Sequence, residues 1–275
     1  MGELHAAVPD IYANPLNDER ALHAMDLTNF QRYESAIRRG ETNLSEELLM
    51  DRDGDIGVYY APFEGINADA KLVLVGITPG PTQMASALKL ARECLSDGLK
   101  PEMALARAKA TAAFSGDTFR NNLIRQLDHW GVNSWLDLES CSALFDSERH
   151  LLHSTSLLRY PVFVRRRKYE GNPNMLSHPL LHRYLHDYFV RDVNALQSAI
   201  FIGLGSKVSA VLDVLAKQGA IDPCRVFTGL FHASPENTYR VDWLTGTRGC
   251  AAPWRTSPSA YDAGRAAFRS AMTAR

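Results

Sequence analysis

The stretch that decides the fold is Lys71-Leu-Val-Leu-Val-Gly-Ile77, followed directly by Thr78-Pro-Gly-Pro81. Its apolar residues are consecutive, so both faces of the strand that it predicts are buried, as in the centre of a parallel sheet. The Pro- and Gly-rich segment ends this strand. Met84, Leu88 and Leu95 then recur at helical spacing, which predicts a helix that stops before Gly98.

The same alternation of strand and helix continues along the chain. Further strands are predicted at 150–158, 199–203 and 225–231, and further helices at 117–130, 177–196 and 259–272. Two more helices are expected, one that starts at Pro101 and one that follows Ser206 with Val208, Val211, Leu212 and Leu215 on one face. Asp117, Ser177 and Ser206 are the expected caps of three of these helices. Strands that alternate with helices predict an α/β fold, here a three-layer α/β/α arrangement around a mostly parallel four-stranded central sheet.

The first 70 residues precede this pattern and are interpreted as an N-terminal extension packed on the main domain, residues 71–275. One helix is expected in the extension, because Leu22, Met25, Phe30, Tyr33 and Ile37 have roughly helical spacing before Gly40. The acidic stretch 51–55 is interpreted as a polar turn. An EF-hand is excluded, because Ile56 and Pro62 occupy the positions that need Gly and Glu.

The composition excludes several classes of protein. The 275 residues carry 30 Lys and Arg against 31 Asp and Glu, so a protein that coats nucleic acid by bulk charge is not expected. The apolar runs are too short to span a bilayer, and no signal peptide is recognised, so a cytoplasmic protein without a membrane partner is expected, associated with the nucleoid if the source is bacterial. The four cysteines, Cys94, Cys141, Cys224 and Cys250, form no C-x-x-C pair, so neither a metal nor an iron–sulfur cofactor is expected.

Three unusual segments fall at or near the carboxyl ends of the predicted strands, where open parallel sheets bind their ligands. They are Gly76-Ile-Thr-Pro-Gly-Pro-Thr-Gln-Met-Ala85, Phe114-Ser-Gly-Asp-Thr118 and Phe231-His-Ala-Ser-Pro-Glu-Asn237. Singly, each is typical of an ordinary turn or of core packing. Their matching positions in the topology favour a shared site.

The first segment resembles motif one of the uracil-DNA glycosylase superfamily, and the nearest type is the single-strand-selective monofunctional one. That motif runs Gly-Met-Asn-Pro-Gly-Pro-Phe-Gly-Met-Ala, and six of its ten positions match here: Gly76, Pro79, Gly80, Pro81, Met84 and Ala85. The third segment is similar to motif two, His-Pro-Ser-Pro-Arg-Asn, and the middle segment to the Phe-x-Gly element of the iron–sulfur glycosylases. The resemblance covers roughly residues 71 to 272.

The resemblance implies excision of uracil or another damaged base from single-stranded or locally opened DNA, the first step of base-excision repair. Such an enzyme takes the base out of the stack and hydrolyses its N-glycosidic bond. Phe114 would stack on the base, His232 would stabilise the departing base, and Thr78 would place the water. Gly76, Ile77, Pro79, Gly80 and Ser154 would hold the base, and Ser234, Pro235, Asn237, Arg165 and Arg166 would contact the DNA.

Three departures from the motifs keep two other hypotheses open. Thr78 stands where the superfamily has Asp or Asn, Ser154 where many members have Asn, and Glu236 where motif two has Arg. A hydroxyl accepts a proton poorly, so one alternative is a relative that binds nucleic acid without catalysis. The other alternative is an α/β enzyme that acts on a nucleoside or nucleotide.

The remaining signals are weaker. Arg159, with the run Arg165–Lys168, indicates either a solvated loop or an edge that contacts phosphate. His178, His182 and His186 share a helix face without a metal-site motif, and the segment 203–207 lacks the spacing of a phosphate-binding loop.

Overall fold

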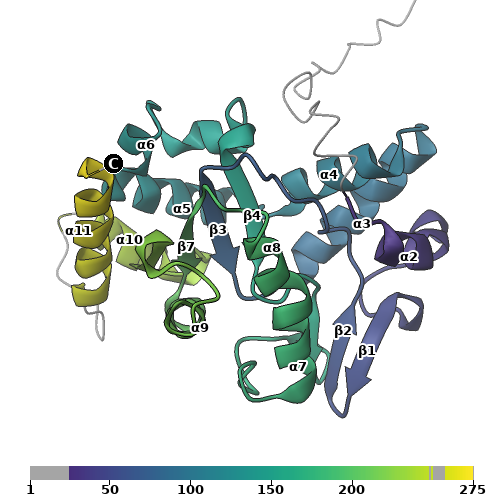
Figure 1. Ribbon diagram of the computed structural model, residues 1–275. Helices are drawn as coiled ribbons and strands as arrows, with labels where there is room; N and C mark the ends of the chain where they lie inside the picture. Colours follow the sequence, from purple (N-terminus) through teal and green to yellow (C-terminus); the bar gives the residue numbers. More distant parts are fainter. Residues whose placement is uncertain (1–24, 248, 250–257, 275) are drawn as a thin grey trace, which may run out of the picture.

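A parallel sheet forms the centre of the computed structural model, which describes residues 25–247, 249 and 258–274 (Figure 1). Its strands lie in the order β4-β3-β7-β8, and all neighbouring pairs are parallel. The bounds are β3 (Leu72–Gly76), β4 (Leu152–Ser156), β7 (Ile200–Leu204) and β8 (Val226–Leu230). All five residues of β3 are buried, as the apolar run predicts.

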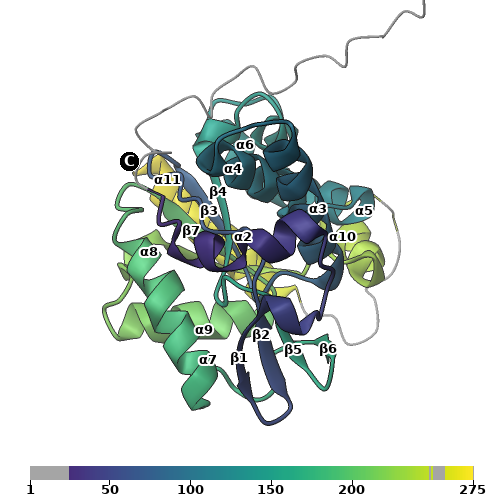
Figure 2. The same ribbon diagram turned by 90° about the vertical axis from the view of Figure 1, so that its right-hand side faces the viewer.

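Helices cover both faces of this sheet (Figures 1 and 2). Val73 and Val75 face a core that α3, α4 and α9 complete, whereas Leu72 and Leu74 face a core with α5 and α11. These helices are α3 (Pro81–Ser96), α4 (Pro101–Ala112), α5 (Asp117–Trp130), α9 (Ser206–Lys217) and α11 (Ser259–Thr273). The predicted α/β class and the four-stranded parallel sheet are therefore confirmed.

A second sheet, which the sequence analysis did not predict, lies beside the first. It is antiparallel, with the order β1-β2-β5-β6, and Figure 2 shows its strands together below α2 (Thr28–Arg39). Its strands are β1 (Leu49–Asp53), β2 (Ile56–Tyr59), β5 (Val162–Val164) and β6 (Arg167–Lys168). The expected polar turn at 51–55 is therefore wrong in extent, since only Gly54 and Asp55 connect the two strands of a hairpin. Strand β2 pairs with β5, so part of the proposed extension and part of the main domain share one sheet.

Three predicted helix caps are wrong. Gly116 precedes α5, Gly205 precedes α9, and His178 precedes the helix expected from Ser177. A Gly with positive φ at the first two sites turns the chain before the helix begins, without a side-chain cap. The expected helix 177–196 is divided into α7 (Pro179–Tyr184), a π-helical segment (Leu185–Val190) and α8 (Arg191–Val193).

The remaining helices are short. They are α6 (Val132–Trp135), α10 (Thr238–Leu244) and the 3₁₀ turns Glu46–Leu48, Cys141–Phe145, Arg149–Leu151, Pro223–Arg225 and Pro235–Asn237. No helix among the described residues is long and apolar enough to cross a membrane. The expected helix residue Leu22 and the fourth cysteine, Cys250, lie outside the described residues.

Two glycines allow α11 to pack directly on β8. A Cβ atom on Gly264 would lie 2.0 Å from the carbonyl oxygen of Thr228 and 2.8 Å from the Trp130 ring. A Cβ atom on Gly229 would lie 2.3 Å from the carbonyl oxygen of Ala260. Backbone and ring atoms cannot move away cheaply, so this contact needs glycine on both elements.

Candidate functional site

The three motif segments meet at the carboxyl-terminal edge of the parallel sheet. A Cβ atom on Gly76, the last residue of β3, would lie 3.3 Å from the Phe114 ring and 3.2 Å from the Ser156 hydroxyl. Phe114 stacks on Phe119 with ring centroids 5.9 Å apart, and Phe119 meets the His232 ring edge-on at 5.4 Å. Segments from three separate parts of the chain are therefore joined by one chain of contacts, from Gly76 through Phe114 and Phe119 to His232.

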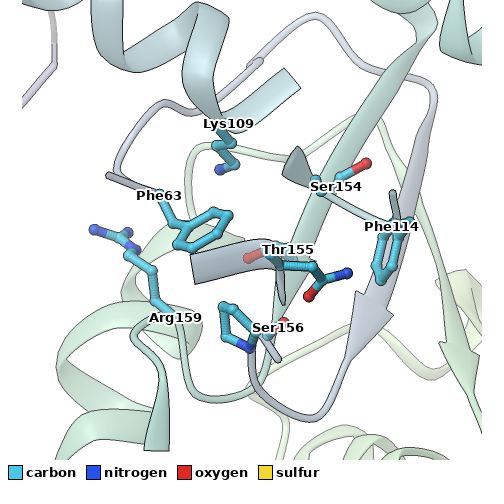
Figure 3. A pocket seen from close by; sticks show the side chains of 10 residues that line it. Phe63, Lys109, Phe114, Ser154, Thr155, Ser156 and Arg159 are labelled. Atoms are coloured by element: carbon cyan, nitrogen blue, oxygen red, sulfur yellow. The ribbon is translucent and has the colours of Figure 1, made fainter. Parts of the chain in front are cut away.

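Phe114 also lines a narrow pocket (Figure 3). Its free volume of about 20 Å³ is enough for one water molecule. Its lining residues are Phe63, Pro79, Gln83, Lys109, Ala113, Phe114, Ser154, Thr155, Ser156 and Arg159. Aromatic rings and hydroxyl groups therefore share this pocket with two cationic side chains.

Thr78 is buried and does not line the pocket. Its hydroxyl donates a hydrogen bond to the carbonyl oxygen of Tyr160 (3.0 Å) and accepts one from the amide of Val162 (3.1 Å). The hydroxyl thus joins the end of β3 to the start of β5. Its single hydrogen is already used, so in this structure Thr78 cannot donate to a water molecule.

His232 follows β8 and is half-buried. Burial lowers the pKa of its imidazole, and the positive charge of Lys168 lowers it further, so the ring is neutral at pH 7. The side-chain amide of Asn237 donates to the backbone oxygen of His232 (2.9 Å), and its oxygen accepts from Arg240 (2.9 Å). Asn237, expected at the DNA, therefore holds the loop that carries His232, whereas Pro235 is exposed.

Lys168 lies between motif one and motif two. It belongs to β6, and its Nζ atom is 3.7 Å from where a Cβ atom on Gly80 would be. Burial lowers the pKa of the Lys168 amine, whereas Glu170 and Glu236 raise it. The sequence alone shows only that Lys168 belongs to a basic run. Its place between the two motifs depends on the antiparallel sheet, which the sequence analysis did not predict.

The tip of the basic run is the turn between β5 and β6. Arg165 and Arg166 adopt positive φ angles of 50° and 63°, and both are exposed. Arg165 pairs with Asp55 at 2.7 Å. Arg166 and Arg167 are exposed and form no ion pair within the described part of the chain, so their positive charges are available to a partner.

At the wall of the pocket and behind it lies a group of buried polar residues that the sequence analysis missed. Lys109 and Glu64 are both buried; burial lowers the pKa of Lys109 to about 7 and raises that of Glu64. His153 is buried nearby, and burial with the Lys109 charge holds its pKa well below the ordinary value. The sequence did hold one indication that Lys109 is buried, because it lies beside the apolar positions Ala108 and Ala112 of α4.

The three histidines of the α7 region have different neighbours. His178 faces Asp53 at 3.7 Å, and the rings of His182 and His186 contact each other at a tilt of 35°, with centroids 4.3 Å apart. Within the described ranges, no three His, Cys, Asp or Glu side chains come close enough together to hold a metal ion.

The fold and the site together define an α/β protein with a small polar pocket at the carboxyl-terminal edge of a parallel sheet. The chain is 35% identical over 201 residues to the uncharacterized protein YoxB of Bacillus subtilis (strain 168), a match that covers 72% of this chain and 78% of that protein. It belongs to the same family as YoxB. No protein-family model matches the chain, and no solved structure matches it.

Proposed function

We propose that this protein is a DNA glycosylase of the uracil-DNA glycosylase type, which takes a base out of single-stranded or locally opened DNA and excises it. The convergence of Gly76, Phe114 and His232 carries this proposal, because these residues come from the three segments that resemble the superfamily. We also propose that the parallel sheet, with helices on both faces, is a three-layer fold of that superfamily.

The chemistry of the site suits a base that leaves with negative charge. A flat ring at Phe114 offers a stacking surface to any base. His232 is neutral at pH 7, and a neutral imidazole carries one N–H that can donate to an oxygen of the departing base once Phe114 and Phe119, which now lie between His232 and the pocket, have moved. The half-buried Ser154 on β4 lines the pocket and adds a hydroxyl for the base edge.

The pocket must widen before it can hold a base, since it now has room for one water. Phe114 lies in the connection between α4 and α5, so its ring can move without breaking either helix. Unstacking a base from a duplex costs a few kcal/mol, which favours single-stranded or damaged DNA as the substrate. Arg166 and Arg167, with Ser234, are the proposed contacts to the phosphates.

A second candidate function is base binding without excision. The hydrogen bonds of Thr78 favour it, because the residue at the water-placing position of motif one is occupied in holding β5. The described residues that line the pocket include no Asp or Glu to take a proton from water.

An excision assay separates the two candidates. Purified protein is incubated with labelled single- and double-stranded DNA that contains one uracil, and alkali then cleaves abasic sites. The glycosylase proposal predicts strand breaks with the wild type and a loss of about 100-fold or more with His232→Ala. Binding without breaks supports the second candidate, and Thr78→Asn is then tested for gained activity. If neither occurs, and free nucleosides or nucleotides raise Tm, the protein acts on small molecules instead.

A further inference from the structure

Two cationic side chains line the pocket from different parts of the chain. Lys109 comes from α4, and Arg159 from the segment that follows β4. Phe63 and Phe114 contribute aromatic rings on two sides of the same space (Figure 3). Neutral ligands do not require two cations at a pocket wall, and charged side chains are costly to bury, so this pairing needs an explanation.

Arg159 is fixed in position by residues behind the pocket. Its side chain is only 10% exposed, it pairs with Asp192 on α8, and its guanidinium lies 5.1 Å from the ring centre of Tyr188. A guanidinium has five N–H donors. The bond to Asp192 uses one of its terminal nitrogens, so further N–H donors of this pocket-lining residue remain for a ligand.

Lys109 has no carboxylate partner of its own. Among the described residues it forms no ion pair, and its amine donates to the backbone oxygen of Gly65. Glu64 accepts a hydrogen bond from the Tyr160 hydroxyl (3.2 Å), and burial raises the pKa of its carboxyl group. A negative charge placed in the pocket would therefore meet the Lys109 amine, which has no ion-pair partner among the described residues, and the Arg159 guanidinium, which Asp192 already pairs.

We infer that this pocket is a subsite for a planar heterocyclic anion, held between Phe63 and Phe114 with its negative charge facing Lys109 and Arg159. The inference rests on the proposed function and deepens it, because a base that leaves its sugar is such an anion. When the bond from C1′ to the base breaks, its electron pair stays on the base. Water supplies the new hydroxyl at C1′, and the released proton goes to solvent or to the base.

In this subsite, Lys109 and Arg159 have a role separate from that of His232. His232 lies beyond Phe114 and Phe119, and it does not line the pocket. The charge of the two cations acts on the whole ring of the ligand, since Coulomb attraction does not need one hydrogen-bond geometry. Arrival of an anion would also raise the pKa of Lys109 from about 7, so proton uptake accompanies binding near neutral pH.

Two free ligands of nearly the same shape test the charge requirement. Barbiturate is a planar pyrimidine-type ring that is an anion at neutral pH, and uracil is its neutral counterpart. Titration calorimetry on the full chain should give barbiturate an affinity at least about tenfold higher than that of uracil. Equal affinities, or no binding of either ligand at millimolar concentration, would overturn the inference.

Variants at Lys109 separate charge from a merely structural role. Lys109→Met should lower the affinity ratio of barbiturate to uracil several-fold, whereas Lys109→Arg should preserve most of it. Lys100→Met, which removes an exposed lysine just before the same helix, is the matched control and should leave the ratio unchanged. A Lys109→Met variant that folds and keeps the full ratio contradicts the inference.

The outcome is distinguishable from failure of the proposed function, because neither ligand needs DNA. Barbiturate preference without excision or DNA binding would leave the anion subsite in place and remove the glycosylase proposal. Excision of uracil without any preference for barbiturate would support the glycosylase proposal and remove the anion subsite.

Discussion

Replacement of Lys109 by Met should change how the stability of the protein depends on pH. The folded protein holds the pKa of Lys109 at about 7, against an ordinary value of 10.5, chiefly because of burial. Between these two values the unfolded chain binds a proton at this residue that the folded protein has released. The contribution of Lys109 to the free energy of unfolding therefore rises with pH across this window.

The size of the effect follows from the same two pKa values. One pKa unit corresponds to about 1.4 kcal/mol, and from about pH 7 to about pH 9 the folded protein loses most of this proton while the unfolded chain keeps it. The wild type should gain about 2 kcal/mol over the variant across that interval. Below about pH 7 both states of the wild type hold the proton, so the difference between the two proteins should become constant.

Urea unfolding of wild type and Lys109→Met, measured in parallel at several pH values, gives this difference directly. Subtracting the two curves cancels the groups that the proteins share, and His153 does not interfere because its pKa is already well below this window. The exposed-lysine variant Lys100→Met should show no such change. A difference that stays flat to within about 0.5 kcal/mol would refute the assignment of Lys109 as a buried amine.

Three further predictions test the packing, the Thr78 junction and the DNA contacts. Gly264→Ala should destabilise the protein by about 2 kcal/mol or more in urea unfolding, because its methyl group meets the Thr228 oxygen; an unchanged midpoint contradicts the packing of α11. Thr78→Val should lower the free energy of unfolding by about 1–3 kcal/mol, since it leaves the buried Val162 amide unpaired. Thr78→Ser keeps the hydroxyl and should cost less. Equal losses in the two variants would argue against the hydrogen bonds of the hydroxyl. Arg166→Ala should weaken binding of single-stranded DNA and lower the salt dependence by a slope of about 0.7, and an unchanged slope would remove this side chain from the interface.

Much of the parallel sheet was predictable because its strands are simple signals. The run 71–77 is apolar at every position that β3 uses, and Gly98 follows the helix that it was expected to end. These features depend on burial of a continuous strand or on a local backbone conformation. Both are properties of a short sequence window.

The antiparallel sheet was not predictable in the same way. Strands β5 and β6 have three and two residues, and β1 carries the charged residues Asp51, Arg52 and Asp53, so none shows a clear alternation. The pairing of β2 with β5 joins residues more than 100 positions apart, and the bond from Val162 to Thr78 joins residues 84 positions apart. Such contacts leave no local pattern.

Some residues of the candidate site were predictable from short motifs, and others depend on the tertiary fold. Phe114, Ser154 and His232 were named from motifs, and the structure brings Phe114 into contact with Gly76 and, through Phe119, with His232. Lys109 was missed because a lysine in a helix is usually solvated, and only the tertiary fold buries this one. The role of Thr78 changed because its hydroxyl found two backbone partners that are far away in sequence.

The central claim is that an extruded base occupies the pocket beside Phe114. Photocrosslinking tests it most directly, with a single-stranded oligonucleotide that carries one 5-iodouracil and with mass spectrometry of the digested adduct. The account predicts an adduct on the peptide that contains Phe114 or on the one that contains Phe63, and loss of the Phe114 adduct in Phe114→Leu while DNA binding persists. Bound DNA that crosslinks only to the hairpin around Arg166, or to neither aromatic residue, would contradict it.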